Sequence, residues 1–158
     1  MDDKIKLETL KSILDNAKAE YSIFTHDVSF TSAESGAKHF GISLAETTPT
    51  IILKAKDGYF AAIICGNTRI SFKKLKQALG VSDISMADPQ TVFNVTGAKI
   101  GEVSLVNSGL PTLIDHNVLK NENCYGGCGV PKTTLRINAH DLVKVTNAQI
   151  LDFADVRS

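Results

Sequence analysis

One lysine stands at the end of an apolar run that is typical of a β-strand. Lys54 follows Ile51, Ile52 and Leu53 and precedes Ala55. An ammonium group costs several kcal/mol to bury without a partner, so such a lysine either extends its head group into solvent or binds something. The residues alone leave both interpretations open, and they make Lys54 the first candidate for a functional cation.

Two histidines are candidates for proton transfer, because imidazole titrates near neutral pH. His26 follows a short predicted strand and stands beside Asp27, and loops at strand ends often carry functional residues. His39 lies late in a predicted helix, where a cation also stabilises the helix dipole. A structural role would explain either histidine equally well.

The segment from Cys124 to Cys128 raises the question of metal or thiol chemistry. A closed zinc site needs four ligands, and His116 would supply only a third. A nucleophilic cysteine needs a lowered thiol pKa, and nothing near these cysteines predicts one. We therefore expect no metal and no cofactor, and we expect the three cysteines to be reduced thiols.

Two glycine-bearing loops could approach a ligand closely. Gly126, Gly127 and Gly129 permit positive φ values and exposed N–H groups, although a bulged strand or tight turn would explain them equally. Gly97 and Gly101 have the spacing of a P-loop, but Glu102-Val103 replaces the required Lys-Ser/Thr. A nucleotide triphosphate site is therefore not predicted.

Length and composition set the frame for these residues. The 158 residues are 43% hydrophobic and 22% charged, which predicts one folded domain over residues 1–158. The formal net charge is zero, so any nucleic-acid contact must come from a local patch. No apolar stretch reaches the roughly 18 residues of a membrane span. The charged N-terminus is not a secretory signal, so we expect a cytoplasmic protein with no membrane partner.

Helices and strands must alternate to position these residues, which predicts an α/β fold of the mixed α+β kind, with helices packed on a mixed sheet. Apolar spacing and capping residues predict helices over 3–18, 31–41, 71–79 and 88–97, and one more helical turn after Asn138. In the first capping box, Thr31 pairs with Glu34. Asp57-Gly58 predicts a hairpin. The predicted strands are 21–25, 50–55, 59–65, 103–106, 113–114, 133–137 and 149–153.

Several segments, in unbroken order, resemble the YbaK-like family, which includes the inserted editing domain of bacterial prolyl-tRNA synthetases and free-standing relatives. The matching residues are His26-Asp27 with Thr31–Gly41, Thr50–Lys54 with Gly58-Tyr59, Arg69-Ile70 with Lys73–Leu75 and Leu79-Gly80, Ala87–Pro89, Thr96-Gly97 with Gly101 and Val103-Ser104, and Leu113–Asp115. A looser match continues through Gly127, Gly129, Leu135–Ile137 and Asp141-Leu142.

The resemblance implies a partly rolled mixed sheet surrounded by helices, and hydrolysis of the ester between a wrong amino acid and the tRNA 3′ end. Cys- or Ala-tRNA(Pro) is the expected substrate class. Lys54 matches the strand lysine tied to editing, so we expect it to orient the substrate and stabilise the oxyanion. Water or a ribose hydroxyl would attack the ester. The other expected substrate-binding residues are His26, Thr31, Ser32, Gly101, Ser104, Gly127 and Gly129.

The expected partners are mischarged tRNA and a synthetase, with prolyl-tRNA synthetase the leading choice. A basic stripe is expected to contact the tRNA; its residues are Arg69, Lys73, Lys74 and Lys76. The alternative is a charged helix face that is only solvated. The relatives commonly carry proline where this chain has Leu105, four residues after Gly101. A non-catalytic module that binds tRNA, a nucleotide or a synthetase is the alternative function. A thiol-dependent hydrolase is a third, weaker one.

Overall fold

The computed structural model describes residues 2–30 and 32–157. Five α-helices, two 3₁₀ helices and ten strands follow one another within this part of the chain. The helices are α1 (Asp3–Asn16), α2 (Ala33–Phe40), η1 (Leu44–Glu46), α3 (Phe72–Leu79), α4 (Pro89–Thr96), η2 (His116–Lys120) and α5 (Ala139–Thr146). The strands are β1 (Tyr21–Thr25), β2 (Thr50–Ala55), β3 (Gly58–Ile63), β4 (Thr68–Ile70), β5 (Ile84–Met86), β6 (Thr112–Asp115), β7 (Asn123–Gly126), β8 (Thr133–Asn138), β9 (Gln149–Leu151) and β10 (Ala154–Val156).

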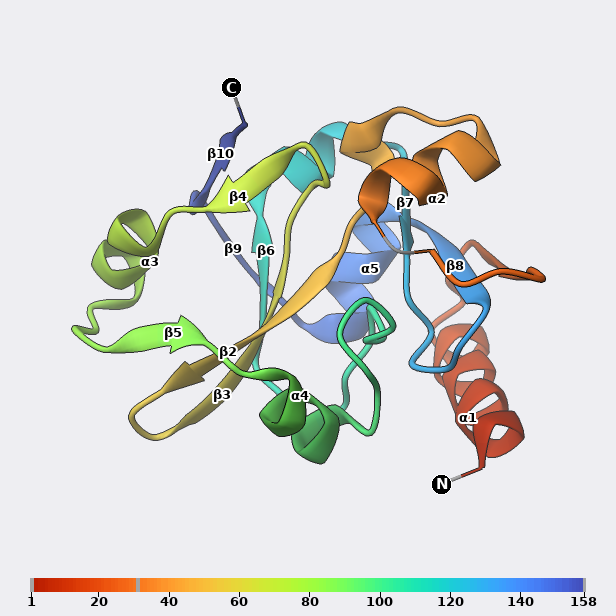
Figure 1. Cartoon of the computed structure of the whole chain (residues 1–158), viewed down its shortest axis with the longest axis horizontal. Helices are drawn as coiled ribbons and strands as arrows, with labels where there is room; N and C mark the ends of the chain where they lie inside the picture. Colours follow the sequence, from red (N-terminus) through yellow and green to blue (C-terminus); the bar gives the residue numbers. More distant parts are fainter. Residues whose placement is uncertain (1, 31, 158) are drawn as a thin grey trace.

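The largest sheet is mixed, with strand order β5-β2-β3-β6-β9 (Figure 1). β2 and β3 form the antiparallel hairpin that Asp57-Gly58 predicts, with Ala55 opposite Gly58. β6 then runs parallel to β3, and β9 parallel to β6. A second, antiparallel sheet has the order β1-β8-β7, and β10 pairs with β4. The predicted mixed sheet with helices against it is confirmed.

The β2–β3 hairpin is buried on both faces by two different helices. Ile52 and Val92 of α4 share one buried cluster, while Leu53 and Leu75 of α3 share another. The near-continuous apolar run of β3 follows from this arrangement, because a strand covered on both faces has no polar side.

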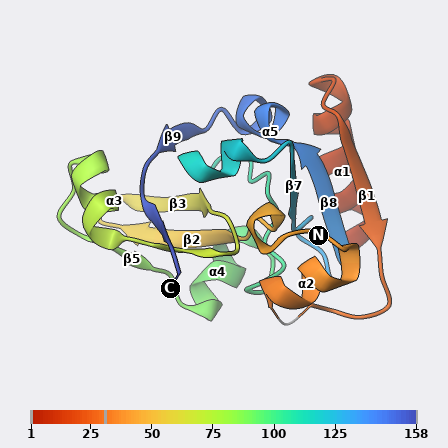
Figure 2. The same ribbon diagram turned by 90° about the horizontal axis from the view of Figure 1, so that it is seen from above.

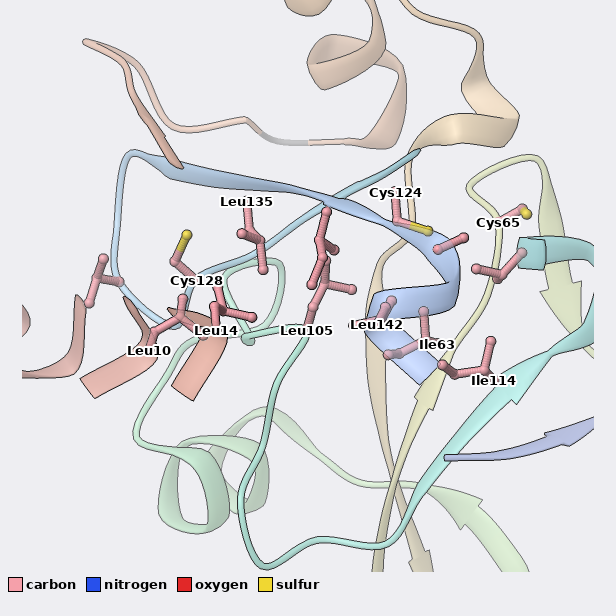
Figure 3. Close-up of a cluster of buried hydrophobic side chains, with 14 residues drawn as sticks. Leu10, Leu14, Ile63, Cys65, Leu105, Ile114, Cys124, Cys128, Leu135 and Leu142 are labelled. Carbon is pink, nitrogen blue, oxygen red and sulfur yellow. The ribbon is translucent and has the colours of Figure 1, made fainter. Parts of the chain in front are cut away.

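The main core lies between the two larger sheets. Leu10 and Leu14 of α1 pack there with Ile63 of β3, Leu135 of β8 and Leu142 of α5 (Figure 3). Each is at most 5% exposed, and burying one such side chain stabilises the fold by about 1.5–3 kcal/mol. This core fixes the β1–β8–β7 sheet against the central sheet, and the cavity described below lies where those sheets meet α2.

Most predicted helix ends are confirmed, but one cap is displaced. Gly41 and Gly97 end α2 and α4 in the left-handed conformation, and Asp88 caps α4 as predicted. The predicted capping box of Thr31 with Glu34 is wrong, because Ser32 is the N-cap of α2 and pairs with Ser35 instead. Thr31 itself lies outside the described residues.

Three predictions about strands and helices need correction. Residues 103–106 form no strand, because the side chains of Val103 and Leu105 are buried in two different clusters. A single bridge joins Ser104 to Gly127. The helical turn after Asn138 is the full helix α5. β4, β5, β7 and β10 were not predicted, since three or four residues carry too little periodicity. Within 2–30 and 32–157, no helix is long and apolar enough to cross a bilayer.

Candidate active site

A cavity of about 510 Å³ lies between α2, the start of β2, the 100–103 loop and the β7–β8 turn. This volume falls within the range of small-molecule sites. Its lining is mainly apolar and aromatic, with hydroxyls, one imidazole and two charged groups interspersed. The lining residues used below are His26, Phe30, Ser32, Gly36, Phe40, Thr47, Thr48, Thr50, Ile51, Gly101, Glu102, Val103, Tyr125, Gly127, Lys132, Thr133 and Thr134.

His26 lies just past β1 and is held by both ring nitrogens. Its Nδ1 is 2.6 Å from the carbonyl oxygen of Val28, and its Nε2 is 3.0 Å from Oγ1 of Thr134. Because Phe24 of β1 pairs with Thr134 of β8, His26 stands diagonally across from Thr134 on the same sheet face. The ring also stacks on Phe30 with centroids 4.3 Å apart. The structure therefore brings His26 into the cavity wall in a fixed orientation.

His39 lies outside the cavity lining but near its aromatic wall. Its ring centroid is 5.1 Å from that of Phe30 and 4.8 Å from that of Phe40. It stands in the last turn of α2 and is exposed. Packing and the helix dipole explain its position.

Ser32 lines the cavity where α2 begins. Its hydroxyl oxygen accepts the backbone N–H of Ser35 at 3.1 Å. The cap therefore already uses one lone pair of this oxygen. Only its other lone pair could accept a hydrogen bond from a molecule in the cavity.

Two of the glycines in the lining, Gly101 and Gly127, matter for different reasons. Gly101 has φ +90°, which a side chain rarely adopts. Gly127 is needed for close packing, because a Cβ there would lie 2.3 Å from the carbonyl oxygen of Val103. At this floor of the cavity, the backbone of Gly127 therefore packs directly against the backbone of Glu102 and Val103.

Replacing Gly127 with alanine is expected to lower the free energy of unfolding by about 1–3 kcal/mol, the usual cost of overpacking. The atom in the way belongs to rigid backbone, so the bridged segments must move apart. Denaturant unfolding measures the change. Gly36→Ala is the matched control, since a Cβ in that helix would lie 3.6 Å from Phe30 and should leave stability equal or higher. Equal stability of Gly127→Ala and the native chain would contradict the expectation.

Three threonines on the cavity wall were not predicted as site residues. Thr47 donates to the carbonyl oxygen of Leu44 at 2.6 Å, and Thr48 donates to that of Tyr125 at 3.2 Å. The Thr50 hydroxyl is buried and has no hydrogen-bond partner within the described chain. A buried polar atom without a partner is costly, and this oxygen is closed off from solvent although Thr50 lines the cavity. In the sequence, Thr50 is marked only as the first residue of the predicted strand 50–55.

Lys132 is the lysine that the structure brings to the cavity. It lies in the turn before β8 with φ +58°, and no other lysine or arginine in the described part of the chain lines the cavity. Its backbone carbonyl accepts from the N–H of His26 at 3.0 Å, which fixes the turn against the end of β1. No periodic pattern marks Lys132 in the sequence, since a lysine in a turn resembles any other solvated charge.

Lys54 lies outside this cavity. It is exposed near the end of β2, opposite Tyr59 and Ser85. Lys54 lies four positions after Thr50. This spacing corresponds to a distance of about 13 Å along a strand. Its ammonium lies close enough to Asp88 to help lower the pKa of that carboxyl, although hydrogen bonds from Thr91 are the larger cause. The structure does not bring Lys54 together with the other expected site residues.

Ser104 and Gly129 also lie outside the cavity lining. Ser104 is buried, and its hydroxyl oxygen accepts the N–H of Val106 at 3.1 Å. Gly129 has φ +87° and packs against Ser104. Leu105, at the position where the resemblance led us to expect proline, is fully buried and donates its N–H to the carbonyl oxygen of Gly127 at 3.0 Å. These residues form the support beneath the cavity floor.

The expected basic stripe lies at the far end of the molecule. In both views α3, which carries its three lysines, is at the opposite end from α2 (Figure 1 and Figure 2). Lys74 is paired with Asp155 at 2.6 Å and with Asp152 at 3.5 Å, and the Asp155 hydrogen bond is the main cause of its raised pKa. Arg69 of β4 stands opposite Asp155. Acidic neighbours therefore offset part of the stripe's charge.

All three cysteines are buried and free. Burial is the main cause that raises the pKa of the thiols of Cys65 and Cys128 to about 11 and that of Cys124 to about 12. A reactive cysteine needs the opposite shift, so these thiols do not supply a nucleophile at neutral pH.

These thiols also predict how stability changes at alkaline pH. An ordinary thiol has a pKa of 9.0, and burial raises the pKa of these three thiols in the folded chain. Above pH 9 the unfolded chain loses thiol protons that the folded chain keeps, so the free energy of unfolding is expected to fall as pH rises toward 11. Urea unfolding at pH 8, 9, 10 and 10.5 measures this. Cys128→Ser should reduce the slope, and an unchanged slope in that variant would contradict the assignment.

One cluster of potential metal ligands exists within the described residues. Asp115, His116 and Asp152 place ligand atoms within 4.8 Å of one another. The Asp115 carboxylate already accepts the N–H groups of Phe153, Ala154 and Asn117. This cluster includes neither Cys124 nor Cys128, and its geometry is explained by structural hydrogen bonds.

Comparison with known proteins places the chain in a family. The model of the aminoacyl-tRNA editing domain matches residues 28–145. Proline–tRNA ligase of Thermosipho melanesiensis is 26% identical over 140 residues, which cover 88% of this chain and 24% of the ligase. The ligase of Caldicellulosiruptor bescii is 26% identical over 156 residues, covering 97% and 26%. The chain thus spans about a quarter of the length of these ligases.

Solved structures share the fold. The hypothetical protein APE2540 has a TM-score of 0.86 at 21% identity, covering 92% of this chain and 99% of that protein. A candidate trans-editing enzyme for prolyl-tRNA synthetase has a TM-score of 0.84 at 19% identity, covering 98% and 99%. The expected relationship to prolyl-tRNA synthetase editing domains is confirmed, and the chain belongs to the aminoacyl-tRNA editing domain family.

Proposed function

We propose that this protein is an aminoacyl-tRNA deacylase that hydrolyses the ester of a mischarged tRNA in trans. The observation that carries the proposal is the 510 Å³ cavity, whose lining segments fall almost entirely within the matched residues 28–145. Its apolar and hydroxyl-bearing wall suits an aminoacyl group, and its open side leaves room for the terminal ribose.

The cavity residues suggest how such a substrate is held. Substrate binding would rotate the buried, unpartnered Thr50 hydroxyl toward the amino or carbonyl group of the aminoacyl ester. Lys132 can stabilise the developing oxyanion from the cavity wall, a role that the sequence assigned to Lys54. The backbone at Gly127 lines the floor on which the aminoacyl group would rest. Water, helped by a ribose hydroxyl of the tRNA, attacks the ester.

The relatives suggest the tRNA and the partner. Both ligases named above act on proline and its tRNA, so mischarged tRNA(Pro), with cysteine or alanine attached, is the proposed substrate. Prolyl-tRNA synthetase is the proposed partner, and the cytoplasm, where aminoacyl-tRNA is made, is the proposed location. We propose that residues 1–158 act as one domain.

A panel of purified mischarged tRNAs tests the proposal directly. Cys-tRNA(Pro) and Ala-tRNA(Pro) are expected to be deacylated faster than Pro-tRNA(Pro), as followed by loss of labelled amino acid. Thr50→Val, which keeps the shape and removes the hydroxyl, should slow the reaction by about tenfold, the worth of one hydrogen bond of about 1.4 kcal/mol. Absence of hydrolysis across the panel would contradict the deacylase function.

The position of Lys54 favours one alternative, a non-catalytic module that binds tRNA or a synthetase. The strand lysine that the resemblance ties to editing lies outside the cavity here. A binding module predicts that tRNA is retained in a filter assay while every ester in the panel stays intact.

A further inference from the structure

The hydrogen bonds of His26 define its tautomer. The partner of Nδ1 is the carbonyl oxygen of Val28, at 2.6 Å, which can only accept. Nδ1 must therefore carry the proton. In the neutral imidazole this leaves Nε2 as an acceptor, turned toward Thr134 at 3.0 Å.

The direction of the second hydrogen bond follows from the first. Since Nε2 accepts, the Thr134 hydroxyl donates its single proton to His26. The lone pairs of that oxygen remain available to accept a proton from a third group. Thr134 is 7% exposed, and both side chains line the 510 Å³ cavity. A hydroxyl, an imidazole and an orienting carbonyl thus stand in a row, which is the arrangement that activates a nucleophile in many hydrolases.

We propose that Thr134 and His26 form a proton relay for ester hydrolysis, with the Val28 carbonyl holding the imidazole in the required tautomer. This inference rests on the proposed deacylase function. Thr134 is the catalytic residue, because its oxygen contacts the attacking water. His26 is the proton acceptor behind it, and the sequence had suggested it only as a substrate-binding residue.

The step balances without a co-reactant. The water oxygen bonds to the ester carbonyl carbon while its proton passes to Oγ1 of Thr134. The proton of Thr134 passes at the same time to Nε2 of His26, giving an imidazolium. When the tetrahedral intermediate collapses, the ester C–O bond breaks and the same relay returns a proton to the leaving ribose oxygen. Amino acid and tRNA are released, and both residues regain their first state.

Substitutions at Thr134 test the relay. Thr134→Val is expected to reduce deacylation by about 10²–10⁴-fold, the range of general acid–base catalysis. Thr134→Ser keeps the hydroxyl and should stay within about fivefold of the native rate. Thr68→Val is the matched control, since this hydroxyl is as buried as that of Thr134 but lies outside the cavity and donates to the carbonyl of Cys65. Thermal melting of each variant reports on folding, and Thr134→Ser tests the relay even if the valine variant is unstable.

Two readouts separate a relay from a structural role. His26→Ala should lose activity like Thr134→Val, and added imidazole should restore part of it, but imidazole should not restore Thr134→Val. Nitrogen-15 NMR of the native protein should show His26 protonated at Nδ1 and not at Nε2. An Nε2–H tautomer, or native rates in Thr134→Val, would overturn the relay.

The outcomes also separate this inference from the function on which it rests. If the native protein deacylates tRNA and both variants match it, the relay is wrong and the deacylase function stands. If the native protein deacylates nothing in the panel, both are wrong. An acylated Thr134, found by mass spectrometry of the quenched reaction, would overturn the relay in favour of a covalent mechanism.

Discussion

Lys132→Ala is expected to slow deacylation of mischarged tRNA(Pro) by about 100-fold, whereas Lys54→Ala should leave the rate within about threefold of native. Removal of one group that stabilises an oxyanion costs about 10²–10³ in rate. Lys132 lines the cavity, and Lys54 stands near the end of β2 beside Asp88. Single-turnover kinetics with saturating enzyme measures the chemical step for both variants.

Lys132→Arg supplies the control for charge. It keeps the cation at the same turn, so it should recover much of the rate. The opposite ranking, with Lys54→Ala inactive and Lys132→Ala active, would return the catalytic role to Lys54. That result would mean that the tRNA end also reaches the outer part of β2.

The second large effect is expected on stability, at Asp115. This carboxylate is fully buried at the end of β6 and accepts the N–H groups of Phe153 and Ala154 at 2.9 and 3.0 Å. Asp115→Ala leaves both donors buried without partners. At about 1–3 kcal/mol for each orphaned donor, the free energy of unfolding should fall by about 2–6 kcal/mol.

Denaturant unfolding of Asp115→Ala measures this loss. Asp155→Ala is the control, because it removes an exposed carboxylate from an ion pair with Lys74, which is usually worth no more than about 1 kcal/mol. Asp115→Asn keeps one acceptor oxygen and should fall between the two. Equal losses for the Asp115→Ala and Asp155→Ala variants would show that the segment leading into β10 is held by packing alone.

The sequence predicted the fold well wherever neighbouring residues determine the backbone conformation. Asp57-Gly58 marked the hairpin, and Gly41 and Gly97 marked two helix ends in the left-handed conformation. The sequence did not predict strands that form only by pairing with a segment distant in the chain. β10 exists because it pairs with β4, more than 80 residues away, and no short pattern in either strand records that contact.

The site was predictable in part for the same reason. His26 and Gly127 were found because their residue types suggest chemistry or close approach, and both line the cavity. Thr134 and Lys132 also line the cavity but were not predicted, because they come there by lying across a sheet from the end of β1. Lys54 was selected because a lysine in an apolar strand is a candidate for binding a partner group. In the structure Lys54 is exposed and lies outside the cavity, and its role in editing stays a prediction.

Leu105 has an evolutionary consequence. Its N–H reaches the Gly127 carbonyl, and its side chain lies where a Cβ at Gly126 would meet it at 2.6 Å. A proline at position 105 has no N–H to donate and has a smaller ring in place of the leucine side chain. A related chain with proline there would have to satisfy the Gly127 carbonyl in another way, and its different side-chain shape would change the space beside position 126. Positions 105 and 126 should covary among related chains, with leucine paired with glycine.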